Sequence, residues 1–326
     1  MIIKYISHGK HVTGGYMHEK FLFETLTEYY KCNKKECNPV EKRNWEFFEG
    51  FRAHLILLFW AFKEAHADIN LTVSRLALPV IIRNLFNTSK TLVVLHNYDP
   101  HDGKNISLKM YYFLLFTLLK FAPKSKVAVI TVARYWENYF KIKKGVSSVF
   151  LFPNFFDSKQ YVQYLLVQKN KTIYMGQYSL KNDKKIFELA KQLHQLGYSC
   201  YFSTNNKNAA KVETAYSIEF FDKFEDYLKK MASCRYTLAL TVINEGWNRV
   251  AHESLLMGTQ VIGYDHGGLG ELLKGSNALI AQNINEVYDL IKNDVNNRIN
   301  KNFLMQYEKV QSIKFIEPIV KFLNEK

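Results

Sequence analysis

Short apolar runs alternate with segments of helical periodicity along the first half of the chain. Such runs are typical of strands buried on both faces, whereas apolar positions three and four residues apart predict helices. Residues 31–49 are polar, and we expect them to be irregular. The alternation predicts a parallel sheet covered by helices on both faces. The predicted strands are 2–7, 69–73, 91–95, 127–132 and 149–152, and the predicted helices are 16–30, 51–65, 79–87, 107–121 and 135–141.

A second alternation of the same kind begins near residue 172, after a stretch at 157–170 that has the composition of a link. The repeated βα pattern predicts an α/β protein with two Rossmann-like domains, in which ligands bind beyond the carboxyl ends of the strands. The predicted strands here are 172–175, 199–203, 236–240 and 260–263, and the predicted helices are 184–196, 226–232, 285–293 and 300–325.

Size and charge narrow the possible partners. The chain has 326 residues, which suits two domains, and a net charge of +14. Its lysines are scattered and form neither a compact basic block nor an aromatic RNA-binding signature, so no nucleic-acid partner is expected. A lysine-rich solvated surface and contact with an anionic membrane both remain open. The four cysteines lack a second pair at metal spacing, and we expect free thiols.

No apolar run reaches the length of about 18 residues that a membrane helix needs. The N-terminus lacks the features of a signal peptide and is interpreted as a first strand. We therefore expect a cytoplasmic protein, with the inner face of the cell membrane as a further possibility. The apolar helix predicted at 107–121, with Lys109 and Lys120 around its most apolar part, is either a core helix or part of a membrane-facing patch.

The segment 244–273 contains the most specific chemistry. Glu245 and Glu253 lie eight positions apart around a turn that opens a predicted helix, and a Gly267-Gly268 loop follows the next strand. A loop that runs into a helix N-terminus offers unpaired N–H groups and a positive dipole end, which suit a phosphate. Carboxylates accept hydrogen bonds from vicinal hydroxyls. Phosphate and polyol together suggest a nucleotide sugar.

This segment resembles the E-x7-E region of retaining GT-B glycosyltransferases, especially glycosyltransferase family 4. The family pattern is matched by Glu245-Gly246-Trp247, by Glu253, by Gly258 to Ile262 and by Gly267-Gly268-x-x-Glu271. Asn248 stands where the family commonly has Gly, and Gln260 stands where it commonly has Pro. The segment 152–157 resembles the family's P-N-G-x-D boundary motif, with Phe155 in place of Gly.

The resemblance implies a GT-B fold, two Rossmann-like domains that face each other across a cleft. It places an acceptor-side domain at 1–157 and a nucleotide-sugar domain at 158–305. A C-terminal helix at 306–326 can pack back on the first domain. The implied activity is transfer of a sugar from a UDP- or GDP-sugar, with retention, to a glycan or lipid-linked acceptor in surface polysaccharide or glycolipid synthesis.

The resemblance also implies roles for residues of the E-x7-E region. Glu245 would hold hydroxyls of the donor sugar, and Glu253, about 12 Å further along the helix, those of the ribose. The backbone amides of Gly246, Trp247 and Asn248 would bind phosphate. The Trp247 side chain is either a packing anchor or a stacking platform.

Three other positions complete the predicted site. Lys181 matches the family's diphosphate-binding Lys, whereas Gln177 stands where an Arg is expected. Gly14-Gly15, in the predicted first βα loop, resembles the family's G-G, and His96 resembles its histidine near the anomeric carbon. We expect no metal, because the chain has no D-x-D motif at a plausible site and the positive charges can take its role. An epimerase, a phosphorylase and a non-catalytic GT-B binding subunit are the alternatives.

Overall fold

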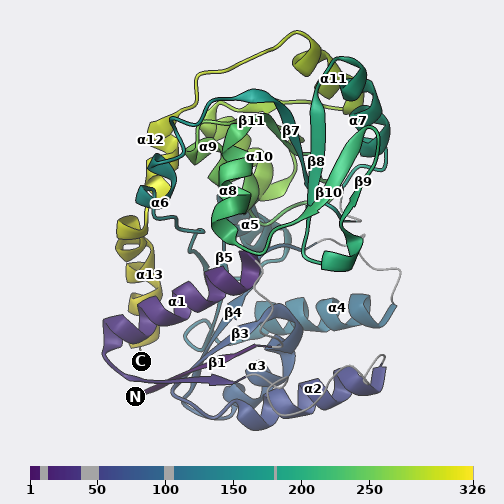
Figure 1. The fold of residues 1–326 in the computed structure, drawn as a ribbon. Helices are drawn as coiled ribbons and strands as arrows, with labels where there is room; N and C mark the ends of the chain where they lie inside the picture. The colour runs from purple at the N-terminus through teal and green to yellow at the C-terminus, as the bar shows by residue number, and fades with distance from the viewer. Residues whose placement is uncertain (8–13, 38–50, 99–105, 180–181, 326) are drawn as a thin grey trace. The chain divides into compact units, whose positions relative to one another are not determined.

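The computed structural model describes residues 1–7, 14–37, 51–98, 106–179 and 182–325, as Figure 1 shows. These residues form two compact units. The first unit contains Met1–Asn154 together with Val310–Lys326, and the second contains Phe155–Lys309. Among the described residues, no helix has both the length and the apolar character that crossing a membrane requires.

The first unit is built on a six-stranded sheet of order β2-β1-β3-β4-β5-β6, in which every neighbouring pair is parallel. The three central strands β3, β4 and β5 are buried, as the sequence predicted, and they carry buried polar side chains such as Asn70 and Thr72 beside the apolar ones. The bounds of the strands are β1 Ile2–Ile6, β2 Asn33–Cys37, β3 Ile69–Val73, β4 Lys90–Val94, β5 Val127–Thr131 and β6 Val149–Leu151.

Strand β2 corrects the expectation that 31–49 is irregular. Its residues are polar and exposed except Cys37, and its backbone pairs with β1 at the edge of the sheet. Hydrophobic patterning cannot detect such an edge strand, because its side chains carry no burial signal. The remainder of the predicted irregular segment, residues 38–49, lies outside the described residues.

Helices cover both faces of this sheet. Helix α1 starts at Gly14, so the two glycines open the helix and do not lie in a preceding loop as predicted. The C-terminal helix α13 packs against α1 and β6, and Lys90 Nζ donates hydrogen bonds to the carbonyl of Phe322 in α13 and to that of Glu325 just after it. The helices of the unit are α1 Gly14–Tyr30, α2 Phe51–Glu64, α3 Ala77–Leu85, α4 Ile106–Phe121, α5 Arg134–Asn138 with a π-helical turn Tyr139–Lys143, and α13 Ser312–Asn324.

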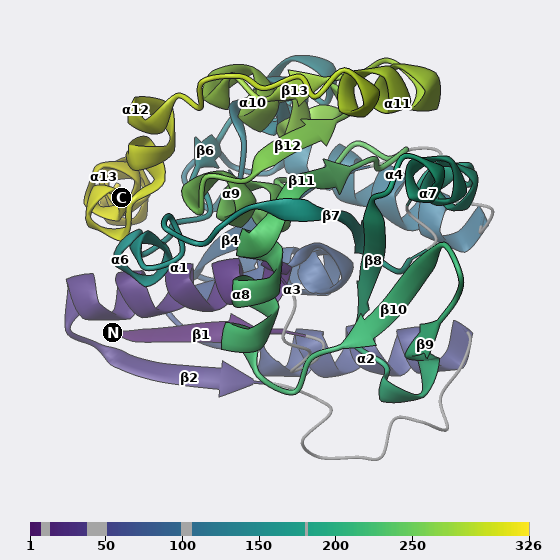
Figure 2. The ribbon, with the colours of Figure 1, turned by 45° about the horizontal axis from the view of Figure 1, so that its top comes forward.

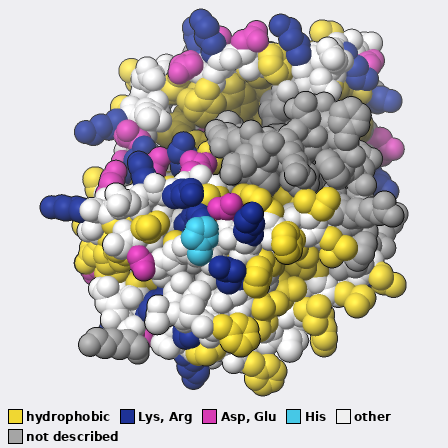
Figure 3. Space-filling model, turned by 90° about the horizontal axis from the view of Figure 1, so that it is seen from below, with side chains coloured by type: hydrophobic (Ala, Val, Ile, Leu, Met, Phe, Trp, Pro, Cys, Tyr) yellow, Lys and Arg dark blue, Asp and Glu magenta, His cyan; other side chains and the backbone are white. Residues whose placement is uncertain are grey.

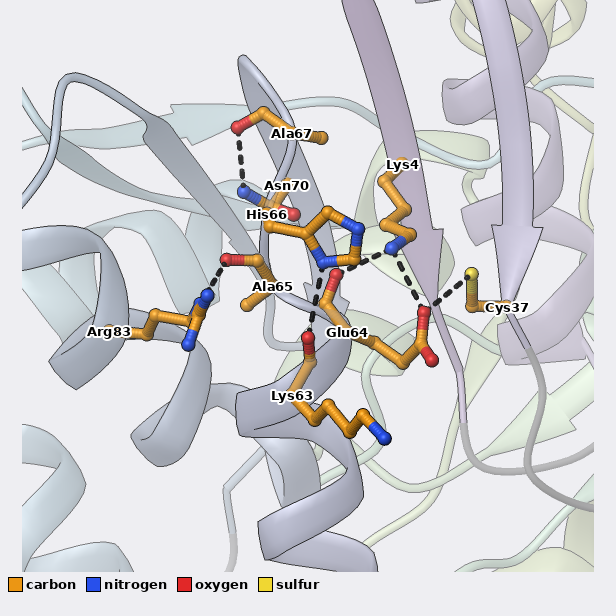
Figure 4. Close-up of polar contacts among 9 residues, drawn as sticks. All are labelled: Lys4, Cys37, Lys63, Glu64, Ala65, His66, Ala67, Asn70 and Arg83. Atoms are coloured by element: carbon orange, nitrogen blue, oxygen red, sulfur yellow. Dashed lines mark hydrogen bonds and ion pairs between the residues drawn. The ribbon is translucent and has the colours of Figure 1, made fainter.

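A buried ion pair ties β1 to the end of α2 (Figure 4). The Lys4 side chain is 2% exposed, and its Nζ donates to Glu64 Oε2 at 2.9 Å and to the Glu64 carbonyl at 2.6 Å. Cys37 donates from its thiol to the same carboxylate, and burial raises the pKa of this thiol. Lys4 can therefore occupy the interior because its charge is compensated there.

The second unit contains a seven-stranded sheet of order β13-β12-β11-β7-β8-β10-β9, and Figure 2 shows β12 through β9 following one another in this order. All neighbours are parallel except β9 and β10. The strands are β7 Asn170–Gln177, β8 Ser199–Thr204, β9 Lys211–Val212, β10 Tyr216–Phe220, β11 Cys234–Ala239, β12 Gln260–Gly263 and β13 Leu279–Ile280.

The helices of the second unit fill the connections between these strands. The predicted link at 157–170 contains the short helix α6 and leads directly into β7. The helices are α6 Lys159–Val162, α7 Ile186–Gln195, α8 Phe224–Ser233, α9 Arg249–Leu256, α10 Gly267–Ser276, α11 Ile284–Lys292 and α12 Lys301–Leu304, with short 3-10 turns at Lys207–Ala209 and Met305–Tyr307.

The prediction of a single helix at 300–325 is wrong. Helix α12 ends at Leu304, and α13 begins at Ser312 after two 3-10 turns. The break has a backbone cause, because Phe156 donates its N–H to Tyr307 and accepts the N–H of Lys309. This pairing holds Glu308 in an extended conformation that a continuous helix does not allow.

Candidate functional site

The turn that follows β11 leads into helix α9 as the sequence predicted. Asn248 is the N-cap of α9, with extended backbone dihedrals, and its Oδ1 accepts the N–H of Ala251 at 2.9 Å. Asn is among the best N-cap residues. The departure from the family's Gly at this position is therefore compatible with the turn. Gly246 and Trp247 immediately precede this cap, at the positive end of the helix dipole.

The Trp247 side chain packs inside the second unit. It is 6% exposed, and its ring lies 4.7 Å from that of Tyr307. Its Nε1–H donates to Nδ1 of His252 at 3.2 Å. Burial, with a smaller contribution from the charge of Arg249, lowers the pKa of His252 to about 3, so this imidazole is neutral and can accept the bond. Of the two interpretations of Trp247, the geometry fits the packing anchor.

Glu253 lies inside α9 and is nearly inaccessible to solvent, with 5% of its side chain exposed. Its Oε1 is 3.3 Å from Arg249 Nη2 and 3.4 Å from the Tyr161 hydroxyl, while Oε2 accepts no hydrogen bond from the described residues. Burial raises the pKa of the carboxyl, and the Arg249 charge and the Tyr161 hydroxyl partly oppose this. The carboxylate thus retains one oxygen for hydroxyl groups of a ligand.

The sequence interpretation missed both partners of Glu253. The i,i+4 spacing of Arg249 and Glu253 on a helix was a readable signal. Tyr161 lies on α6, far away in the chain, and no local pattern connects it with α9.

Helix α10 begins at Gly267, where a loop was expected, and it holds the Glu245 turn in place. Gly267 has φ +57°, and a Cβ added there would lie 2.5 Å from the Glu245 carbonyl oxygen. The next residue, Gly268, donates its N–H to that oxygen at 2.8 Å. The close approach of two backbones explains a glycine at this position. The turns after β11 and β12 therefore form one connected structure.

The end of β7 carries the predicted Gln177. Its side chain is exposed, and its carbonyl accepts a hydrogen bond from Asn182 Nδ2 at 2.7 Å. The preceding Gly176 has φ +91° and passes close to the backbone of β11. The predicted Lys181 lies outside the described residues.

The first unit brings the predicted Gly15 and His96 together. A Cβ added to Gly15 would lie 3.3 Å from His96 Nε2, so the imidazole packs closely over the start of α1. His96 Nε2 is 2.8 Å from Glu19 Oε1, and the Tyr5 hydroxyl donates to the other oxygen of that carboxylate. Burial and the Glu19 charge raise the pKa of Tyr5, so it remains a donor.

Glu19 is a further residue that the sequence interpretation did not include. It lies one helical turn after Gly15, and both of its carboxylate oxygens are engaged. Because a carboxylate only accepts hydrogen bonds, Glu19 places a proton on His96 Nε2. In the neutral tautomer, His96 Nδ1 is then an acceptor for a ligand hydroxyl.

Within the part of the chain that the structure describes, no three His, Cys, Asp or Glu side chains are placed to share a metal ion. The expectation of a metal-independent site stays a prediction.

Comparison with known proteins places this geometry in a fold class. No protein-family model matches the sequence, and no curated protein matches it. Solved structures do match over the whole chain. Anabaena HepE in complex with UDP and glucose is similar with a TM-score of 0.69 at 15% identity, covering 100% of this chain and 99% of HepE.

Two further structures show how widely the fold is used. A glycosyltransferase from Rickettsia africae has a TM-score of 0.65 at 12% identity, with coverage of 100% and 99%. The UDP-GlcNAc 2-epimerase from Methanocaldococcus jannaschii has a TM-score of 0.61 at 12% identity, with coverage of 99% and 100%. The chain therefore has the GT-B fold, with two Rossmann-like domains, as predicted. Fold alone does not define a reaction.

Proposed function

We propose that this protein is a glycosyltransferase that moves a sugar from a UDP- or GDP-sugar to a glycan or lipid-linked acceptor with retention at the anomeric carbon. The observation that carries the proposal is the connected turn before α9. The Glu245 backbone is fastened to the start of α10, and Glu253 lies on the helix that this turn opens. HepE, which shares the fold, was solved with UDP and glucose.

The donor occupies the carboxyl ends of β7, β11 and β12 in this proposal. Glu245 accepts hydroxyls of the sugar, and Oε2 of Glu253 accepts those of the ribose. The backbone amides of Gly246, Trp247 and Asn248 bind the diphosphate, together with Lys181 near Gln177. As the bond from the anomeric carbon to the phosphate oxygen breaks, these groups stabilise the charge that develops on the leaving diphosphate.

The acceptor side of the reaction belongs to the first unit. His96, fixed by Glu19, accepts a hydrogen bond from a sugar hydroxyl near the anomeric carbon. Gly15 leaves room for the His96 ring at the start of α1, and in this proposal the ligand lies beside Gly14 and Gly15. The acceptor oxygen bonds to the anomeric carbon on the face that the diphosphate leaves. The hydroxyl proton passes to that diphosphate, so no protein base is required.

Nucleotide binding tests the donor half of the proposal. UDP and GDP are added to the wild type, to Glu253→Ala and to a surface control on the same unit, Glu188→Ala. A ligand at 100 times its Kd stabilises the folded state by about 2.7 kcal/mol, which raises the Tm by several degrees. We expect the rise in wild type and Glu188→Ala only. A wild type with no rise for either nucleotide contradicts the proposal.

The product identifies the reaction class. Incubation with the sugar donor of the bound nucleotide and an oligosaccharide acceptor yields a new glycosidic bond, whose anomeric configuration NMR compares with that of the donor. An epimerase converts the donor without an acceptor, a phosphorylase cleaves the oligosaccharide with inorganic phosphate and no nucleotide, and a binding subunit gives no product. Each of these three results replaces the transferase with an alternative.

Contact with a membrane forms a separate part of the proposal. Helix α4 buries one face and exposes the other, and α3 packs between α2 and α4. Their outer sides form what we term the α2–α4 apolar face, and Figure 3 shows hydrophobic side chains gathered on this side of the first unit. The exposed fraction reaches 71% at Phe59 and 70% at Phe113. The face includes Leu55, Phe59, Ile82, Met110, Phe113 and Phe121.

Cations accompany this face. Lys109 and Lys120 are exposed on α4, and the guanidinium of Arg83 lies 5.1 Å from the ring centre of Phe62. Apolar side chains among Lys and Arg suit the interface of an anionic bilayer, which gains both apolar burial and charge attraction. We therefore propose that the α2–α4 apolar face rests on anionic lipid at the inner face of the cell membrane, where a lipid-linked acceptor is available.

Vesicle sedimentation tests this contact. We expect the wild type to sediment with vesicles of mixed phosphatidylglycerol and phosphatidylcholine and not with phosphatidylcholine alone. Phe59→Ser/Phe113→Ser abolishes sedimentation, whereas Val212→Ser, at an 86% exposed apolar position of the second unit, does not. Unchanged sedimentation of the double variant, or none of the wild type, removes the membrane from the proposal. If the face instead binds a second copy of the chain, the wild type is a dimer in solution and the double variant is a monomer.

A further inference from the structure

Arg249 is a largely buried cation that makes few hydrogen bonds with the described residues. It is the first residue of α9, and 16% of its side chain is exposed. A guanidinium carries five N–H groups. Among the described residues, its side chain makes one hydrogen bond, a long one of 3.3 Å to Glu253.

The guanidinium is also held in a defined place. Its central carbon lies 4.6 Å from the ring centre of Phe156, within the second unit. Contact with the face of an aromatic ring leaves the in-plane N–H groups available for an acceptor. The other N–H groups of the guanidinium make no hydrogen bond to the described residues, and a planar array of such donors matches phosphate oxygens. The arrangement therefore points to an oxyanion ligand.

The position of Arg249 in the chain indicates which anion it binds. It directly follows the Gly246 to Asn248 turn, whose amides bind the diphosphate in the proposed function. Glu253 lies one helical turn further along, at the proposed ribose position. Compared with the family pattern, the predicted diphosphate site lacks one cation, because Gln177 stands where an Arg is expected.

We propose that Arg249 binds the diphosphate of the nucleotide-sugar donor and supplies the cation that Gln177 lacks. This inference rests on the proposed function, since it assigns a contact in the same donor site. Arg249 exchanges its long contact with Glu253 for hydrogen bonds to phosphate oxygens. The Glu253 carboxylate is then free to accept the ribose hydroxyls.

A simpler role for Arg249 is that of counter-ion to the buried Glu253. The two roles differ in which part of the nucleotide they affect. A phosphate contact influences the affinity for UDP and not that for uridine. A counter-ion acts through the ribose carboxylate, and its loss weakens both ligands equally.

Calorimetric titration with the diphosphate, the monophosphate and the nucleoside separates these roles. We use the uridine or guanosine series according to which diphosphate binds the wild type. Arg249→Met is expected to weaken the diphosphate about 10- to 100-fold, the range for hydrogen bonds to charged groups, and to leave the nucleoside within about twofold. Arg249→Lys, which keeps the charge, shows a smaller loss.

Two further variants make the result decisive. Glu253→Gln is expected to weaken the nucleoside and the diphosphate by the same factor. Gln177→Arg, in the Arg249→Met background, is expected to restore part of the diphosphate affinity. Circular dichroism and Tm verify that each variant is folded, and Arg249→Lys serves if Arg249→Met is not.

The outcomes also separate this inference from the proposed function. Equal losses for diphosphate and nucleoside in Arg249→Met, or no loss for the diphosphate, overturn the role of Arg249 while the donor site stands. A wild type that binds neither UDP nor GDP overturns the proposed function itself, and this inference with it.

Discussion

The contact between Gly267 and Glu245 offers the sharpest test of how the donor turn is held. Gly267→Ala places an L-residue at φ +57°, and the left-handed region costs such a residue about 1–2 kcal/mol. Its Cβ would lie 2.5 Å from Glu245 O and 3.0 Å from Glu245 N. Ordinary contacts lie at about 3.5 Å, so the Glu245 backbone must move by about 1 Å.

This displacement weakens the hydrogen bond from Gly268 to Glu245, which contributes about 1 kcal/mol. We therefore expect Gly267→Ala to lose about 2–3 kcal/mol of unfolding free energy in total. A misplacement of about 1 Å at a reacting group also lowers turnover, here by roughly 100-fold. Donor titration, transfer rate and Tm measure the two effects separately.

Gly197→Ala is the matched control. Gly197 has φ +81°, lies in the same unit, and has no atom within 4 Å of an added Cβ. It incurs the backbone cost of about 1–2 kcal/mol without the collision, and full activity is expected. If Gly267→Ala matches Gly197→Ala in both Tm and turnover, the Glu245 turn is not positioned by this contact and the reasoning is refuted.

Four further predictions concern stability, pH and catalysis. Lys4→Met leaves the Glu64 carboxylate buried without its cation, so chemical denaturation should show a loss of about 3–5 kcal/mol, and Lys4→Met/Glu64→Gln should recover much of it. An equal loss in both variants argues against the ion pair. His252 has its pKa lowered to about 3 in the folded state, so the unfolded chain binds the proton first, and stability falls as pH decreases through the window from 6.5 to 3. Between pH 7 and pH 5 this residue should lower the free energy of unfolding by about 2 kcal/mol. His252→Gln should flatten the pH dependence of denaturation, and a pH dependence that the substitution leaves unchanged contradicts this. Glu19→Ala and His96→Ala should each lower kcat, and the double variant should be no worse than either single one, whereas additive losses mean that Glu19 does not act through His96. EDTA should leave the transfer rate unchanged, and a loss that Mg²⁺ restores would show that the reaction needs a metal.

Some parts of the architecture could be predicted because their signal is local. The strands at 69–73 and 260–263 match the predicted bounds, since each carries the Ile, Leu or Val side chains that are typical of a short buried strand. The polar edge strand β2 left no such run. The predicted helix at 300–325 failed because the backbone of Phe156, distant in the chain, interrupts it.

The candidate site also has features that local sequence signals predict and features that they do not. The turn before α9, its polar N-cap and the positions of Glu245 and Glu253 could be anticipated from residue types and spacing, since capping and helix phase are local properties. The partners of these residues could not. Tyr161 reaches Glu253 from another helix, and Glu19 contacts His96 although the two residues are 77 positions apart in the chain.

The sequence by itself determined two βα alternations, the location of the carboxylates and the glycines, and the resemblance on which the proposed chemistry rests. Tertiary structure alone decided that Gly267 presses on the Glu245 backbone and that Arg249 is enclosed between Glu253 and Phe156. The physical reason is the distance along the chain over which each interaction acts. Helix phase, capping and apolar runs act over a few residues, whereas close backbone contacts and the burial of charge depend on segments that only folding brings together.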